Sequence, residues 1–423
     1  MTMRQDAEQI IRASLQAVQP DAAVQRALED IRFEAEGRLI LVAIGKAAWQ
    51  MAKAASHKLG GRIHSGIVIT KYDHVMGPLP NLLMREAGHP VPDANGFAAT
   101  EEAIALVQDL TPRDSVLLLI SGGGSALFES PLIPGEELQS ITDQLLRSGA
   151  DIVEINTIRK RLSRVKGGRF AQLCAPARVY AVVLSDILGD PLDMIASGPA
   201  TPDTSTTEDA LRVVKKYALY LSPQAEALLQ KETPKALANV RALVTGSVRH
   251  LCEAAAKAAA TLGYHPHILA DSLSCQAREA GSFMGSIARR HQSTGSSLAF
   301  IVGGETVVKL TGSGKGGRNH ELALAAAKGL QGTTNTALFS LGSDGTDGPT
   351  DAAGGYVDQD TALQLAGQGV DIDQVLQQND AYHALERVGG LLMTGPTGTN
   401  VNDVSVLLIR RGALESPSIA CNM

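Results

Sequence analysis

Short apolar segments alternate along this chain with segments whose apolar residues recur at helical spacing. Such alternation predicts an α/β protein with layered helices and a mostly parallel sheet. The apolar segments of the first half predict strands at 38–44, 66–70, 115–120 and 179–184. The pattern resumes in the second half, with strands expected at 241–244, 265–270, 297–302, 306–310, 336–341 and 404–410. Helices are expected at 6–18, 151–170, 251–262, 274–290 and 321–329, with another beginning at residue 47.

The chain is long enough to require more than one hydrophobic core. Its 423 residues predict two domains or three. Segments 201–207 and 222–234 are richer in Pro, Ser, Thr and Lys than their surroundings, and the strand–helix alternation starts again soon after them. We therefore predict a boundary near residue 240, with one domain over residues 1–240 and a second, smaller domain over residues 241–423.

Charge and composition exclude several classes of partner. The net charge is −6, no long Lys/Arg block occurs, and aromatic residues make up only 4% of the chain. A nucleic-acid partner is therefore not expected. No apolar run approaches the roughly 20 residues of a membrane span, and residues 1–18 lack a signal-peptide core. The four cysteines form no Cys-x-x-Cys pair. A cytoplasmic protein without a membrane partner is expected, and a homodimer is left open.

A run of three glycines follows the most apolar predicted strand. The segment after strand 115–120 consists of Ser121, Gly122, Gly123, Gly124 and Ser125. Glycines let backbone N–H groups approach an anion closely, and a following helix adds the positive end of its dipole. The segment therefore predicts a phosphate-binding loop. A plain tight turn is the alternative, although a turn needs fewer glycines.

A second glycine-rich segment lies between the predicted strand 306–310 and the predicted helix 321–329. Gly312, Gly314 and Gly317 satisfy G-x-G-x-x-G, which raises a dinucleotide-binding alternative. That pattern lacks the acidic residue about 20 positions further on that would bind the ribose. A glycine loop with cations suits a triphosphate instead, and an arginine can neutralise charge on the transferring group. We predict phosphate binding by Lys315, Gly316, Gly317 and Asn319, with Arg318 beside them. An ordinary helix start with incidental charge is the alternative.

Cations also gather on one predicted helix. At 3.6 residues per turn, an arc of roughly 120° holds Asn156, Arg159, Lys160, Ser163 and Lys166. Clustered like charges repel one another unless an anion or carboxylate faces them. Arg159 and Lys166 are therefore candidates for binding a substrate carboxylate. A basic face exposed to solvent is the alternative.

Carboxylates follow two other predicted strands. Asp186 and Asp190 come after strand 179–184, and Asp344 comes after strand 336–341. Magnesium accepts one or two carboxylates together with phosphate oxygens, so these three are candidate ligands. Asp residues that form ordinary turns are the alternative. Lys46 ends the first strand where a helix begins, and a lysine there can meet an anion as a point charge.

Together these segments resemble the type-2 glycerate kinase family, a two-domain family whose C-terminal half is the MOFRL domain. His320 stands where Gln is common in that family, and no departure breaks a motif. The resembling segments span nearly the whole chain in family order: AIGKAA (43–48), ISGGGSAL (120–127), EINTIRKRLSRVKGG (154–168), LSDILGDPLDMIASGPATPD (184–203), GGETVVKL (303–310), GKGGRNHELAL (314–324), GSDGTDGPTDAAGG (342–355) and GPTGTNVNDV (395–404).

The resemblance implies ATP- and Mg²⁺-dependent phosphorylation of D-glycerate, giving 2-phosphoglycerate. It implies an active site in the cleft between a Rossmann-like, three-layer αβα N-terminal domain and a smaller α/β C-terminal domain with a mixed sheet. Lys46 and Arg318 match the residues proposed as catalytic in the family. Some members are named hydroxypyruvate reductase, so a nicotinamide-dependent reductase using the 312–317 glycines is the alternative. A non-catalytic nucleotide sensor is a third class.

Overall fold

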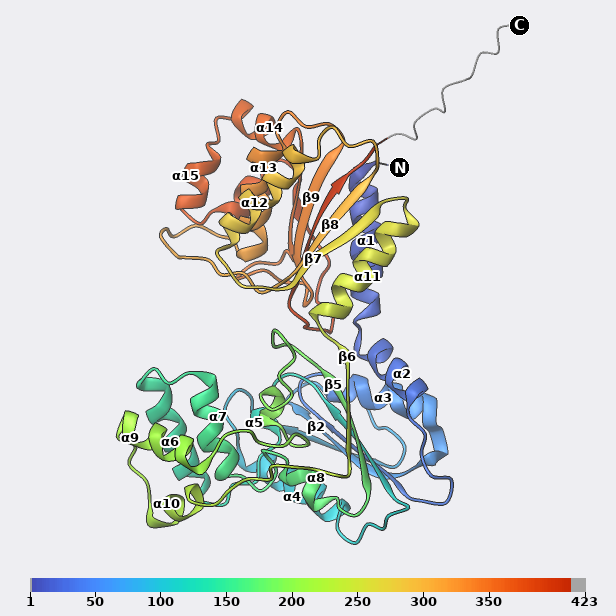
Figure 1. The fold of residues 1–423 in the computed structure, drawn as a ribbon, viewed down its shortest axis with the longest axis vertical. Helices are drawn as coiled ribbons and strands as arrows, with labels where there is room; N and C mark the ends of the chain where they lie inside the picture. Colours follow the sequence, from blue (N-terminus) through green and yellow to red (C-terminus); the bar gives the residue numbers. More distant parts are fainter. Residues whose placement is uncertain (1, 412–423) are drawn as a thin grey trace, which may run out of the picture. The chain divides into compact units, whose positions relative to one another are not determined.

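The computed structural model describes residues 2–411, which form two compact units (Figure 1). The N-terminal unit is Pro20–Gly246, and the C-terminal unit combines Met1–Gln19 with Ser247–Met423. The division differs from the predicted boundary at residue 240 in two ways. Helix α1 (Met3–Ala17) packs with the C-terminal unit, where Tyr264 donates to Asp6 Oδ2 at 2.6 Å. The predicted strand 241–244 is the last strand of the N-terminal sheet rather than the first of a new one.

The sheet of the N-terminal unit has six strands, all parallel. The predicted strands 38–44, 66–70, 115–120 and 179–184 are all present, and an unpredicted strand, β3, forms one edge. In chain order the strands are β1 (Leu39–Ile44), β2 (Ile63–Lys71), β3 (Leu82–Ala87), β4 (Ser115–Ile120), β5 (Arg178–Leu184) and β6 (Val240–Gly246).

The strands are arranged in the order β3-β2-β1-β4-β5-β6, which is the order of the Rossmann fold. From β1 the chain first adds strands on one side, and after β3 it crosses back to place β4 on the other side. β1 and β4 therefore flank the point where the strand order reverses. Ligands of open α/β sheets bind outside the carboxyl ends of the strands at such a point.

Both faces of this sheet are covered by helices, which gives the predicted three-layer αβα arrangement. Side chains alternate along β1, so that Leu39, Leu41 and Ala43 point to one core while Ile40, Val42 and Ile44 point to the other. The first core includes α2 (Pro20–Asp30) and α3 (Ala48–Leu59), and the second includes α4 (Ala94–Leu106), α5 (Gly124–Leu127) and α8 (Arg169–Leu173). Short 3-10 turns lie at Gly60–Arg62 and Ile195–Ser197.

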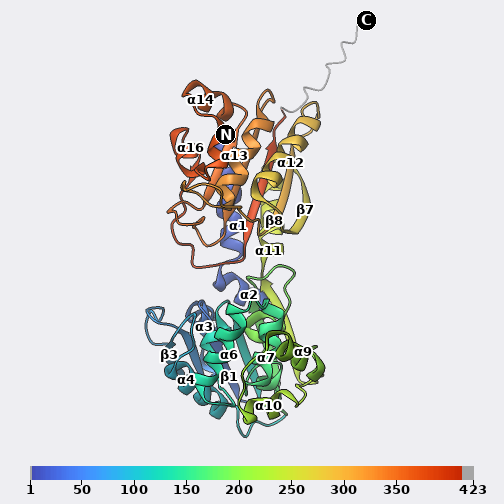
Figure 2. The same cartoon turned by 90° about the vertical axis from the view of Figure 1, so that its left-hand side faces the viewer.

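Four further helices of the N-terminal unit share a separate apolar cluster. They are α6 (Gly135–Arg147), α7 (Ile152–Arg161), α9 (Thr207–Tyr217) and α10 (Pro223–Leu229), and Figure 2 shows them grouped together. The predicted helix 151–170 is wrong in length, because α7 ends at Arg161. The chain then turns through Gly167 and Gly168, both in the left-handed region, before α8 begins.

The sheet of the C-terminal unit is mixed, in the order β11-β10-β9-β12-β8-β7. Its strands are β7 (His265–Leu273), β8 (Leu298–Gly304), β9 (Thr336–Gly342), β10 (Gly354–Asp358), β11 (Leu391–Leu392) and β12 (Asp403–Ile409). β12 runs antiparallel between β8 and β9, so its first residue pairs with the last residues of both, Gly304 and Gly342. The predicted strand 306–310 is wrong, since only Val307 makes an isolated bridge there.

Helices also cover both faces of this second sheet (Figure 1). α1 and α11 (Val248–Thr261) pack on one face. The core on the other face contains α12 (Ala277–Arg290), α13 (Arg318–Leu330), α14 (Thr361–Gly367), α15 (Ile372–Gln377) and α16 (Ala381–Arg387). Within residues 2–411, none of the helices has both the length and the apolar character needed to cross a membrane.

Candidate active site

The loops that follow β1 and β4 are joined by hydrogen bonds at the point where the strand order reverses. The backbone N–H of Lys46 donates to Gly122 O at 2.9 Å, and the N–H of Ala47 donates to Ser121 Oγ at 3.0 Å. Gly45 is required here because a Cβ atom on it would lie 2.4 Å from Ser121 O. The side chain of Lys46 is exposed. An exposed cation thus stands at the position where Rossmann-like sheets bind ligands.

Each glycine of the 122–124 run lies close to a neighbouring side chain. A Cβ atom on Gly122 would lie 2.2 Å from Asp186 Oδ2, and one on Gly124 would lie 2.7 Å from Ala196 Cβ. At Gly123 a Cβ atom would lie 3.0 Å from His89 Nε2 and 3.1 Å from Lys46 Cγ. The structure therefore brings Lys46, Asp186 and His89 around one loop. His89 was not predicted as a site residue. The sequence offers one indication of it, a polar residue two positions after a strand. That strand, β3, was not predicted.

Arg159 and Lys166, the two cations predicted to bind a substrate carboxylate, both donate hydrogen bonds to the carbonyl of Ser125 at the end of this loop. Lys166 Nζ donates to Ser125 O at 2.8 Å and to Phe128 O at 3.0 Å, and it lies 3.4 Å from the Glu129 carboxylate. Its side chain is 0% exposed. Burial lowers the pKa of the Lys166 ammonium to about 8, against the opposing charge of Glu129. Arg159 Nη2 also donates to Ser125 O, at 2.9 Å, but its side chain keeps 13% exposure.

Asn156 of α7 is linked to the same loop through Ser197. Ser125 Oγ lies 3.0 Å from Ser197 Oγ, which in turn donates to Asn156 Oδ1 at 2.8 Å. Asn156, Lys160 and Lys166 are all buried. The alternative of a basic face exposed to solvent is therefore wrong for this segment.

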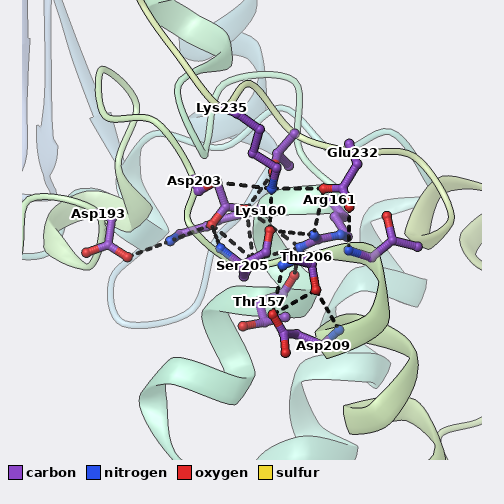
Figure 3. A network of polar contacts seen from close by, with 12 residues as sticks. Thr157, Lys160, Arg161, Asp193, Asp203, Ser205, Thr206, Asp209, Glu232 and Lys235 are labelled. Atoms are coloured by element: carbon purple, nitrogen blue, oxygen red, sulfur yellow. Dashed lines mark hydrogen bonds and ion pairs between the residues drawn. The ribbon is translucent and has the colours of Figure 1, made fainter.

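A buried ionic network fixes the chain between β5 and α9 onto α7 (Figure 3). Lys160 Nζ donates to Asp193 Oδ2 at 3.0 Å and to Asp203 Oδ1 at 3.2 Å. Arg161 Nη1 donates to Ser205 Oγ at 2.9 Å and lies 3.6 Å from Asp203. Asp203 further accepts from Thr233 Oγ1 at 2.7 Å. The network therefore anchors the part of this segment that follows Asp186 and Asp190.

The three proposed metal ligands are divided between the units. Asp186 lies against Gly122, and Asp190 lies on the same loop of the N-terminal unit with its Oδ1 buried and without a hydrogen-bond partner. A buried carboxylate oxygen without a hydrogen bond is a group that a cation would satisfy. Asp344 belongs to the C-terminal unit, where its Oδ1 accepts from Thr346 N at 3.0 Å. Within residues 2–411, three or more His, Cys, Asp or Glu side chains nowhere form a group able to hold a metal ion.

In the C-terminal unit, Arg318 is held by two carboxylates at the carboxyl ends of β8 and β9. Its Nε and Nη2 donate to Asp403 at 2.5 and 3.0 Å, and its Nη1 donates to Glu305 Oε1 at 2.9 Å. Burial raises the pKa of Asp403 to about 6 although Arg318 acts in the opposite direction. About a third of the Arg318 side chain is exposed, so a fixed guanidinium is accessible from solvent.

Asp347 occupies the N-terminus of α13. Its carboxylate accepts from the backbone N–H groups of Asn319 at 3.1 Å and His320 at 2.8 Å, and His320 Nδ1 also contacts it. Asn319 is one of the residues predicted to bind phosphate, and its amide is taken by Asp347 instead. A carboxylate of the protein therefore uses the positive end of this helix.

The glycine loop before α13 packs against the segment 377–382. Backbone N–H groups of Gly312, Gly314 and Lys315 donate to Asn379 Oδ1, Gln378 O and Asp380 Oδ1, at 2.8 to 2.9 Å. Gly316 lies in the same packed loop, and Gly317 N donates to His320 Nδ1 at 3.2 Å. The Lys315 ammonium lies 3.8 Å from the centre of the Tyr382 ring. The Lys315 side chain is 37% exposed, so it can meet a ligand, while several amides of the loop serve the fold.

The fold and these two groups of residues define a class: a two-domain α/β protein that presents fixed cations, carboxylates and a glycine loop at strand ends. Such sites suit small anionic ligands. Two family models match the chain: that described as "Domain of unknown function (DUF4147)" over residues 6–230, and that of the MOFRL family over residues 298–403.

Named relatives and a solved structure identify the family. The D-glycerate 2-kinase of Thermotoga maritima is 51% identical over 414 residues, covering 96% of this chain and 99% of that protein. A crystal structure of glycerate kinase from Thermotoga maritima superposes with a TM-score of 0.91 at 50% identity, covering 96% and 99% of the two chains. A protein of Agrobacterium vitis named putative hydroxypyruvate reductase is 38% identical over 422 residues, covering 97% and 95%. The chain belongs to the glycerate kinase family, and the resemblance predicted from its motifs is confirmed.

Proposed function

We propose that this protein is a glycerate 2-kinase that transfers the γ-phosphoryl group of ATP to D-glycerate and releases 2-phosphoglycerate. The observation that carries the proposal is the grouping of Lys46 and Asp186 around the glycine loop 122–124, at the reversal of strand order. The names of the relatives at 51% and 50% identity support the same reaction.

In this proposal the loop Ser121–Ser125 binds phosphates. In the C-terminal unit the side chain of Lys315 is the candidate phosphate ligand, because the Gly317 and Asn319 amides are bonded within the protein. Mg²⁺ would be held by Asp186 and Asp190 of the N-terminal unit, and Asp344 is the candidate ligand within the C-terminal unit. The unpaired Oδ1 of Asp190 fits a hard cation. When bound, the ion would neutralise charge on the phosphate oxygens.

Phosphoryl transfer requires mainly positioning and electrostatic stabilisation, so no covalent nucleophile is needed. Lys46 and Arg318 are proposed to stabilise the charge that develops on the transferring group. The Asp403 and Glu305 contacts fix the Arg318 guanidinium before the reaction, so little reorganisation is required. Arg159, which keeps some exposure, is the proposed partner of the substrate carboxylate. Lys166 is proposed to act through the Ser125 and Phe128 carbonyls that it holds.

A nicotinamide-dependent hydroxypyruvate reductase is the second candidate, favoured by the name of the Agrobacterium vitis relative and by the Rossmann strand order. A reductase would bind its dinucleotide at the glycines of 312–317. Their packing against 377–382 and the amides that they donate inside the protein favour the kinase.

One experiment separates the candidates. Purified protein is mixed with ATP, MgCl₂ and D-glycerate, ADP is measured by a coupled assay, and ³¹P NMR identifies the phosphoglycerate isomer. A parallel reaction follows NADH or NADPH oxidation with hydroxypyruvate. ADP together with 2-phosphoglycerate, both abolished by EDTA, is expected. Nicotinamide oxidation without ADP formation would replace the kinase by the reductase. The cytoplasmic location and a homodimer stay predictions.

A further inference from the structure

His89 occupies a defined position at the strand ends of the N-terminal unit. It lies two residues after β3, and its ring contacts the Cα side of Gly123, where a Cβ atom would lie 3.0 Å from both Cδ2 and Nε2. The turn before it is tightly packed, since a Cβ atom on Gly88 would lie 2.7 Å from Val91 O. His89 and Lys46 therefore approach the same glycine from two loops.

The charges around His89 favour the neutral imidazole. Burial, followed by the cations Lys46 and Lys71, lowers its pKa from the ordinary 6.5. Asp93, the carboxylate at the end of the same turn, accepts from Tyr72 OH at 2.5 Å and from Gly96 N at 2.9 Å. Asp186 lies against the neighbouring Gly122. A neutral imidazole can accept a proton, whereas an imidazolium cannot.

Within the part of the chain that the structure describes, the ring of His89 has no hydrogen-bond partner, in contrast to the rings of His74 and His320. Among residues 2–411 the structure shows no hydrogen bond made by the His89 ring. His74 interacts with the backbone carbonyl of Lys46, and His320 is fully buried against Asp347. His89 is partly exposed, and its ring lies beside the proposed reaction site without a hydrogen-bond partner among the described residues.

We propose that His89 is the general base of phosphoryl transfer, accepting the proton of the glycerate hydroxyl at the oxygen that attacks the γ-phosphorus. This inference deepens the proposed kinase function and rests on it. As the new O–P bond forms, the P–O bond to ADP breaks, ADP leaves with the electron pair, and the hydroxyl proton moves to the imidazole. Lys46 and Lys71 disfavour the resulting imidazolium, which promotes release of the proton to water.

The first test compares His89→Gln with His64→Gln, a matched substitution of an exposed histidine on β2. Loss of a general base lowers turnover by about 10²- to 10⁴-fold. We expect that loss in kcat for H89Q, with the KM for ATP almost unchanged and with wild-type kinetics for H64Q. An H89Q enzyme that turns over as fast as the wild type would overturn the assignment.

A second test separates proton transfer from positioning. The kcat of the wild type should fall with decreasing pH as a group with a pKa below 6.5 becomes protonated, and H89Q should lack that titration. Added imidazole should restore turnover to His89→Ala. Loss of kcat without rescue by imidazole and with an unchanged pH profile would assign His89 a positioning role and refute the base. If the wild type forms no ADP, the proposed function itself fails, whereas an active wild type with active H89Q removes only this inference.

Discussion

Replacing Lys166 with Met tests whether this lysine supports the loop or binds substrate. In the structure its ammonium joins Ser125 O, Phe128 O and the Glu129 carboxylate, and neither Lys166 nor Glu129 has exposed side-chain surface. A lysine so enclosed would have to break these contacts to meet glycerate. We therefore expect the substitution to destabilise the N-terminal unit.

The expected magnitude follows from what the substitution leaves behind. Glu129 would remain buried with Arg159 Nη2 at 3.8 Å, and removing one partner of a buried ion pair costs about 3–5 kcal/mol. Changing Glu129 to Gln as well removes the uncompensated charge. The double variant should then lose only about 1–3 kcal/mol, because Phe128 O loses a donor while Ser125 O keeps Arg159.

The chain contains a convenient probe. Trp49 is the only tryptophan, is buried, and lies in the N-terminal unit, so its fluorescence in urea reports the unfolding of the unit that holds Lys166. Lys58→Met, at an exposed position of α3, is the matched control and should stay within about 0.5 kcal/mol of wild type.

The pH dependence of unfolding gives a second readout of the same group. The folded pKa of Lys166 is about 8, below the ordinary 10.5, so between these values the unfolded chain binds more protons than the folded one. Stability of the wild type should therefore rise with pH over that window, by about 3 kcal/mol in total from this group. The Lys166→Met variant should lack this rise.

A different pattern would refute the reasoning. If Lys166→Met unfolds at the wild-type urea concentration and raises the KM for D-glycerate, then Lys166 contacts substrate and the observed enclosure does not describe its function.

Three further predictions concern Arg318, the 122–124 glycine run and the N-terminus of α13. Arg318→Ala should lower kcat by about 10³- to 10⁵-fold with a smaller effect on the KM for ATP, and steady-state kinetics showing an equal loss of both would count against a transition-state role. Gly122→Ala should sharply reduce kcat because its Cβ would lie 2.2 Å from Asp186 Oδ2, whereas Gly61→Ala, with no atom within 4 Å, should behave as wild type; a fully active G122A would contradict the packing argument. Asp347→Ala removes the cap of α13 and should destabilise the protein by about 1–2 kcal/mol in thermal unfolding followed by circular dichroism; an unchanged Tm would exclude a capping role.

The sequence predicts where many strands lie along the chain better than it predicts which sheet each strand joins. Strand 115–120 is found with its predicted bounds, because an uninterrupted apolar run is buried on both faces of a parallel sheet. β3 and β10 were missed, since β3 is a half-exposed edge strand and β10 begins with two glycines. The assignment of β6 to the first sheet depends on pairing with β5, a long-range contact that local patterns do not encode.

The cations of α7 show a second limit of the sequence. Their common direction follows from helical spacing, but their partners come from distant segments. Glu129 lies before the helix, and Asp193 and Asp203 lie 33 and 43 residues beyond Lys160. Burying a charge is unfavourable unless it is paired, and nothing local to 151–168 reveals such a pair. For this reason the sequence of the helix alone does not distinguish buried, paired cations from a basic face exposed to solvent.

The glycine loops 121–125 and 312–317 look alike in the sequence but differ in what their glycines contact. Both follow an apolar segment and precede a helix, yet their glycines are needed for different neighbours. Gly312 and Gly314 allow contact with the backbone of 378–380, where the loop donates its amides. Gly122 and Gly123 instead make room for the side chains of Asp186, His89 and Lys46. A loop whose amides serve the fold has few left for phosphate, so the 121–125 loop is the stronger candidate for phosphate binding, and what the 312–317 loop offers a ligand is mainly the side chain of Lys315.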